Sequence, residues 1–193
     1  MNVPESSSCE GNREIGKTPI NDVLRASLCQ IEEFSEKATE NLIPPESWES
    51  IRSLCTSRMQ DRQLDPHARI RWARIAVTAS DRKVAEGTSG LLKFTAEQAR
   101  IKVYAIREFG VDYHDTVRDP NSLCRQIIES ISYRREEIER DATRWRDLPT
   151  PEILTLRLIK NVLTPLRDIE TSLPDSPDGQ HLRSLLPLIE LLP

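Results

Sequence analysis

Five prolines in this sequence stand where amphipathic stretches begin. They belong to the pairs Thr18-Pro19, Pro44-Pro45, Asp65-Pro66, Asp119-Pro120 and Thr150-Pro151. Proline is tolerated at the first position of a helix because its missing N–H has no intrahelical partner there, and a preceding Thr or Asp accepts bonds from the free N–H groups. The prolines therefore predict five helix starts and indicate an all-α fold.

Apolar side chains follow the first three prolines at three- and four-residue spacing, as on one face of a helix. We predict helices over residues 19–42, over residues 45–59, and from residue 66 onward. The third of these is apolar over most of its circumference, which is typical of a helix at the centre of a bundle.

A fourth helix is predicted from a capping box rather than from a proline. Thr95 stands three residues before Gln98, the spacing at which the two side chains cap each other's backbone N–H groups. Gly110 is the residue type that usually ends a helix. We expect residues 86–90, which include Gly87-Thr88-Ser89-Gly90, to form a flexible linker before this helix.

Two more helices are predicted in the C-terminal half. The longest runs over residues 120–147, about 40 Å at 1.5 Å per residue, with a polar gap near Arg134. Another begins at Thr150-Pro151, and Pro165 is expected to bend it or to end its first half near Thr164.

These elements predict an irregular bundle of about six helices. We expect a disordered lead over residues 1–17, a helical bundle domain over 18–173, and a turn with a short leucine-rich helix over 174–193. The turn is assigned to Pro174, Pro177 and Gly179, and the centre of the bundle to the 120–147 helix and the third helix.

Composition agrees with a globular helical protein in a reducing compartment. The 193 residues include only three each of Phe, Tyr and Trp, and 30% are charged. The four cysteines, Cys9, Cys29, Cys55 and Cys124, are far apart in sequence, unlike the close pairs of zinc or redox sites. We expect no metal, no cofactor and no membrane span, and an intracellular location in the cytoplasm or nucleus.

An enzyme has little support in the sequence. His67, His114 and His181 are far apart, and the most suggestive of them, in Tyr113-His114-Asp115, lies in a predicted loop without an identifiable nucleophile. The acidic runs also contain basic residues at helical spacing, as on a solvated helix face. We therefore predict a protein without catalytic activity.

The basic middle of the chain is one candidate binding site. Residues 56–110 carry 11 Lys or Arg against six Asp or Glu, whereas both flanking parts are acidic. Helical spacing places part of this charge on two ridges, made of His67, Arg71, Arg74, Arg82, Arg100, Tyr104 and Arg107. Such ridges can hold a nucleic-acid backbone and stack on bases. The alternative, which we favour, is that acidic segments of the same chain cover these arginines.

The C-terminal leucines are the second candidate. Two copies of the pattern L-x-x-L-L supply Leu182, Leu185, Leu186, Leu188, Leu191 and Leu192. A short helix of this kind can enter the hydrophobic groove of a partner protein. We favour the alternative that the leucines fold back onto the protein's own core, because exposed they would form a large apolar patch.

The sequence resembles no family closely enough to name one. Its leading hypothesis is a non-enzymatic interaction or adaptor protein that binds a protein partner and self-associates into a homo-oligomer through its long helix. The alternative is a regulator that binds RNA or DNA through the basic ridges, a type of small helical protein also found among viral accessory factors.

Overall fold

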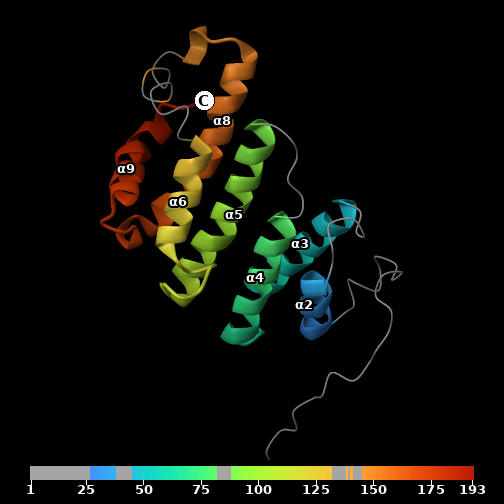
Figure 1. The fold of residues 1–193 in the computed structure, drawn as a ribbon. Coiled ribbons are helices and arrows are strands. Elements are labelled where there is room, and N and C mark those ends of the chain that lie inside the picture. Colours follow the sequence, from blue (N-terminus) through green and yellow to red (C-terminus); the bar gives the residue numbers. More distant parts are fainter. Residues whose placement is uncertain (1–26, 38–44, 82–87, 132–137, 139, 141–144) are drawn as a thin grey trace, which may run out of the picture.

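The all-α fold is confirmed. The computed structural model describes residues 27–37, 45–81, 88–131, 138, 140 and 145–193 (Figure 1). Within these ranges there are seven α-helices, three 3₁₀-helices and no strand. The predicted lead over residues 1–17 and the Thr18-Pro19 start lie outside the described residues. No helix in the described ranges is long and apolar enough to cross a membrane.

Three helices begin at the predicted prolines. They are α3 (Pro45–Gln60), α4 (Pro66–Asp81) and α6 (Pro120–Ile131), and a fourth, α8 (Thr150–Leu163), has Pro151 in its first turn. Asp65 accepts a hydrogen bond from the Ala68 N–H at 3.0 Å, and Asp119 accepts one from the Asn121 N–H at 2.9 Å. The acidic residues therefore cap the helices, as their positions predict.

The first helix of the described chain has a capping box that the sequence analysis did not single out. Helix α2 (Leu28–Lys37) covers part of the predicted 19–42 helix. Just before it, the Ser27 N–H donates to the Gln30 side chain at 2.8 Å, and the Gln30 N–H donates to Ser27 Oγ at 3.4 Å. The reciprocal bonds satisfy two N–H groups at this end of the helix.

The predicted start of the fourth helix is wrong. Helix α5 (Thr88–Phe109) begins seven residues before Thr95 and includes Gly90, so residues 88–90 belong to the helix and not to a linker. Thr95 is buried and its hydroxyl has no hydrogen-bond partner, so it caps nothing. The other end is as predicted, because Gly110 follows the helix with a φ of 82°, which favours glycine.

The C-terminal region is helical on both sides of Pro165. Helix α8 ends at Leu163, and the 3₁₀-helix η4 (Thr164–Ser172) continues the chain, which confirms the predicted break. Helix α9 (Pro177–Leu185) and the 3₁₀-helix η5 (Leu186–Glu190) follow. The predicted turn is thus shorter than expected, since Pro177 and Gly179 lie in the first turn of α9. A Cβ on Gly179 would lie 2.0 Å from the Pro174 carbonyl oxygen, so this close approach requires glycine.

The predicted long helix is only partly described. Helix α6 covers residues 120–131, and Trp145–Asp147 forms the separate 3₁₀-helix η3 rather than the end of an α-helix. Arg134, the position of the predicted polar gap, lies outside the described residues.

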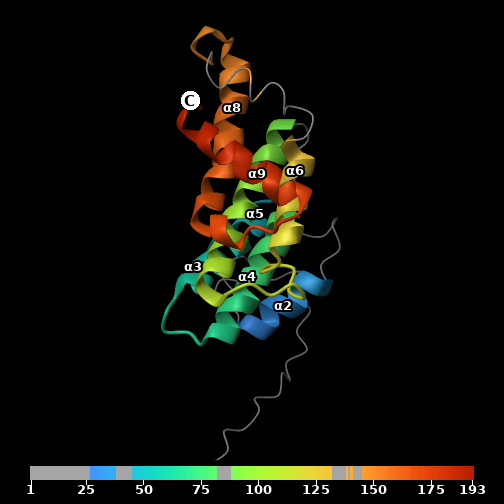
Figure 2. The ribbon, with the colours of Figure 1, turned by 90° about the vertical axis from the view of Figure 1, so that its left-hand side faces the viewer.

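Helix α5 lies at the centre of the fold and contributes to two apolar cores (Figures 1 and 2). The N-terminal core joins α5 to α2, α3 and α4, through residues such as Ile51, Trp72 and Ile101. The C-terminal core joins α5 to α6, α8, η4, α9 and η5, through residues such as Ile127 and Leu163. The predicted centre is therefore wrong. Among the described helices, α5 alone contributes side chains to both cores, whereas α4 packs in the N-terminal core and α6 in the C-terminal core.

Candidate functional site

The basic ridges are largely neutralised by carboxylates from other parts of the chain. Arg71 on α4 donates from Nε to Glu32 of α2 at 2.7 Å. Arg74 lies 3.3 Å from the buried Asp115, and Arg107 lies 2.7 Å from Asp168 of η4. These ion pairs balance the charge of the three arginines but do not cover them, since the side chains of Arg74 and Arg107 are each 53% exposed. Nucleic-acid binding by these ridges stays a prediction.

The other ridge residues differ in their contacts and exposure. Tyr104 accepts a hydrogen bond from Arg69 at 2.7 Å, and the Arg107 guanidinium stacks over the Tyr104 ring at 6.0 Å. His67 and Arg100 are exposed, on α4 and α5 respectively, whereas Arg82 lies outside the described residues.

A buried arginine, which the sequence analysis missed, links helices in the N-terminal core. Arg69 is 6% exposed and donates to the Met59 carbonyl at 2.9 Å and to Glu108 at 3.0 Å, in addition to Tyr104. Its guanidinium also stacks over the Phe109 ring at 4.9 Å. The signal was present in the sequence, because Arg69 precedes the apolar Trp72 and Ala73 by three and four positions and shares their helix face.

Asp115 organises the loop between α5 and α6. The carboxylate is buried and accepts hydrogen bonds from Arg118 at 2.8 Å, from Arg74 at 3.3 Å and from the Val117 N–H at 3.2 Å. Burial alone raises the pKa of this carboxyl, but the three hydrogen bonds outweigh burial and hold its pKa below the ordinary value. Asp115 is thus a structural anchor of the loop.

Replacing this anchor has a pH-dependent effect on stability. Because its pKa is lower in the folded protein, Asp115 stabilises the fold above its ordinary pKa of 3.8, and this contribution is lost as pH falls through the folded-state value. We expect Asp115→Asn to lower the free energy of unfolding by about 2 kcal/mol at neutral pH, and the difference from wild type to shrink as pH falls below the ordinary pKa of 3.8. Urea unfolding of the variant and of wild type, at neutral pH and at a pH below 3.8, measures this difference. The exposed Asp147→Asn is the control, and an equal loss at both pH values would contradict the anchor role.

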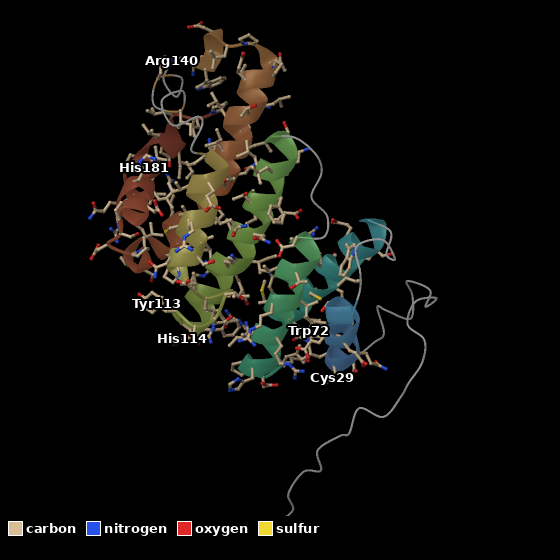
Figure 3. The ribbon with its side chains drawn as sticks, viewed as in Figure 1. Cys29, Trp72, Tyr113, His114, Arg140 and His181 are labelled. Carbon is tan, nitrogen blue, oxygen red and sulfur yellow. The ribbon has the colours of Figure 1, made fainter. Side chains whose placement is uncertain are left out.

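The histidines are not brought together. Tyr113 and His114 are exposed on the loop after α5, whereas His181 lies on α9 in another part of the molecule (Figure 3). Among the described residues no group of three or more His, Cys, Asp or Glu could hold a metal ion. Cys55 and Cys124 lie in different cores, and burial raises their thiol pKa values to about 12 and about 11. Cys9 lies outside the described residues.

The C-terminal leucines pack in the C-terminal core. Leu182, Leu185, Leu186 and Leu192 are each at most 4% exposed, and Leu188 is half-buried against the same core. Only Leu191 of the six is exposed, at 45%. The Lys160 ammonium donates to the Leu192 carbonyl at 2.8 Å and fastens the last residues to α8. These contacts favour the core role over insertion into a partner's groove.

A shallow apolar groove lies between α5 and α8, and the sequence analysis did not predict it. Phe94 and Leu158 line a pocket of about 280 Å³ together with Lys93, Glu97 and Arg100. The two helices lie side by side (Figure 1). Leu91 stands one turn before Phe94 on α5, and Leu154 stands one turn before Leu158 on α8, so each shares a helix face with one of the lining residues. We call Leu91, Phe94, Leu154 and Leu158 the α5–α8 groove.

A second pocket, of about 490 Å³, lies where α4, α5 and α6 meet. Its wall includes Lys102, Gln98 and Gln126, with Arg125 and Asp81 nearby. Lys102 is only 5% exposed, although it lines the pocket. We call this the Lys102 pocket. The sequence did not predict this pocket, because Lys102 stands between two apolar residues on α5 and belongs to neither basic ridge.

Comparison with known proteins supplies no relative. The chain matches no family model, no curated protein and no solved structure. The proposals for the candidate sites therefore rest on the geometry of this chain alone.

Proposed function

We propose that this chain is a non-enzymatic interaction protein that binds an acidic amphipathic helix of a partner protein in the α5–α8 groove. The observation that carries the proposal is the exposure of large apolar side chains on two adjacent helices: Leu154 is 51% exposed and Leu91 is 38% exposed. Large apolar side chains exposed near one groove are a common feature of protein interaction sites.

The shape of the groove suits a helical partner. Side chains of both helices line it, among them the half-buried Phe94 of α5 and Leu158 of α8. A partner helix with apolar anchors at i and i+4 can bind in a groove between two helices. Phe94 belongs to neither of the two cores, so its ring is available to a ligand.

Charge at the groove favours an acidic partner. Lys93 and Arg100 are exposed beside the apolar residues and form no ion pair within the described part of the chain. The carboxylate of the same wall, Glu97, already faces Arg52 at 3.6 Å. A partner helix with Asp or Glu beside its apolar anchors would therefore complement the groove in both polarity and charge.

The proposal is tested by selecting helical peptides from a display library against the full chain. We expect selection to enrich peptides with Leu or Phe at i and i+4 and with acidic residues between them. Leu154→Asp is expected to weaken the best peptide at least about tenfold in fluorescence anisotropy, because it places a carboxylate among the apolar anchors. Arg100→Glu should weaken it as well, by repelling the acidic residues.

The matched control is Leu191→Asp, which changes a leucine of similar exposure outside the groove. This variant should bind the selected peptide like wild type. Enrichment of peptides without acidic or apolar pattern, or equal binding by wild type and Leu154→Asp, would overturn the proposal.

Two finer features belong to the same proposal. We also propose that the chain self-associates through the 120–147 segment. Light scattering on the full chain measures its oligomeric state, and a strictly monomeric protein would contradict this part of the proposal. A reducing location, in the cytoplasm or nucleus, is consistent with the free thiols of Cys29, Cys55 and Cys124.

A further inference from the structure

The Lys102 pocket contains a buried amine without an ion-pair partner. Within the described residues, Lys102 Nζ forms one hydrogen bond, to the Gln126 side-chain oxygen at 2.9 Å, and no ion pair. Burying an ammonium group without a carboxylate in contact costs free energy. Such a lysine therefore favours its neutral form, or binds a ligand that compensates its charge.

The hydrogen bonds around this amine have a fixed direction. Lys102 donates to the Gln126 oxygen, the Gln126 amide donates to the Gln98 oxygen, and the Gln98 amide donates to Asp81 at 2.6 Å and to the Val77 carbonyl at 3.3 Å. Gln126 therefore presents an acceptor, not a donor, to the lysine. The neutral amine can keep this bond through one N–H while its lone pair stays free.

Charged groups from each neighbouring element act on the amine. Burial lowers the pKa of Lys102, and the carboxylates of Asp81 on α4 and Asp119 before α6 oppose this only in part. Arg74 from α4, and Arg125 and Glu129 from α6, also line the pocket. The neutral, nucleophilic form is thus more populated at neutral pH than that of an exposed lysine.

We propose that Lys102 binds small aldehydes or ketones that carry an anionic group, by forming an imine with them. The pocket is large enough for a small metabolite, and Arg125 is exposed on its wall without an ion pair to any described residue. The Ser122, Thr78 and Thr116 side chains of the same wall supply further polar contacts. Arg125 would hold the anionic group while Lys102 reacts with the carbonyl.

The covalent step needs no oxidant or reductant. The Nζ lone pair attacks the carbonyl carbon, and the nitrogen loses its protons as the carbonyl oxygen gains two and leaves as water. A C=N bond replaces the C=O bond, so the reaction is a reversible condensation. This site is separate from the α5–α8 groove and does not depend on the proposed partner.

The full chain tests the proposal with glyoxylate as the probe. Glyoxylate has an aldehyde next to a carboxylate, and cyanoborohydride reduces its imine to a stable carboxymethyl-lysine. Peptide mapping by mass spectrometry then compares the lysines of one sample. We expect Lys102 to be modified several-fold faster than the exposed Lys93 at neutral pH, despite its burial. In urea this preference should disappear, because both lysines are then solvated.

Two further measurements separate a binding site from a reactive but unselective amine. Propanal, which lacks the carboxylate, should label Lys102 less than glyoxylate does, and Arg125→Gln should remove this difference without lowering the melting temperature. The proposal is overturned if Lys102 is labelled no faster than Lys93 in the folded protein. It is also overturned if glyoxylate and propanal label Lys102 equally in wild type.

Discussion

Arg69→Ala is expected to lower the free energy of unfolding by about 3 kcal/mol, and the melting temperature by about 10 °C in a chain of this size. The side chain is 6% exposed and contacts α3 and α5 from its position on α4. Its removal leaves the Met59 carbonyl without its bond from Arg69, the Tyr104 hydroxyl without a donor and the Glu108 carboxylate without its cation. Each loss adds to the cost of the cavity.

A second variant, Arg69→Lys, separates the contribution of the positive charge from that of the guanidinium geometry. Arg69→Lys keeps the positive charge but cannot reach the carbonyl, hydroxyl and carboxylate together, so we expect it to recover less than half of the loss. Arg62→Ala, at an exposed position, is the control and should change stability by less than about 0.5 kcal/mol. Thermal unfolding followed by circular dichroism measures all three. A loss below about 1 kcal/mol for Arg69→Ala would show that the arginine does not tie the helices together.

Leu163→Ala, a truncation in the C-terminal core, is expected to lower the free energy of unfolding by a similar amount. Leu163, the last residue of α8, is fully buried. Its truncation removes apolar contacts and leaves a cavity between packed helices, which typically costs about 2–5 kcal/mol. Urea unfolding measures the change. Leu191→Ala removes the same atoms from a site that is 45% exposed and should cost much less. Equal effects of the two truncations would contradict the assigned core.

Helix starts could be predicted from the sequence because their causes are local. Pro66 and Pro120 fix the backbone at their own positions, and Asp65 and Asp119 cap the adjacent N–H groups. The end of α8 before Pro165 is equally local, because proline cannot continue the hydrogen bonds of the helix. None of these features requires knowledge of a distant residue.

The start of α5 could not be predicted in this way. Thr95-Gln98 has the capping-box pattern, and Gly90 favours a break, yet burial of Leu92 and Ala96 in the C-terminal core stabilises helix through both positions. Tertiary packing therefore outweighs the local preferences. The same packing makes α5 the central helix, which its local sequence does not reveal.

The binding candidates depended even more on long-range contacts. The predicted arginine ridges depend on acidic partners far along the chain, which lie 39 residues away for Arg71, 41 for Arg74 and 61 for Arg107. The α5–α8 groove and the Lys102 pocket each combine side chains from separate helices. Only the burial of the C-terminal leucines followed from composition, because exposing them together would be unfavourable.

Because α5 contributes side chains to both cores, we expect it to couple them into one cooperative unit, and the tryptophans allow a direct test. Trp48 and Trp72 lie in the N-terminal core, whereas Trp145 packs against the C-terminal core. In Trp145→Phe, fluorescence therefore reports only on the N-terminal core, and Leu163→Ala can be added to weaken the other core. We predict that this addition lowers the urea midpoint seen by fluorescence as much as the midpoint seen by circular dichroism. An unchanged fluorescence midpoint, with an early loss of helicity, would contradict the coupling through α5.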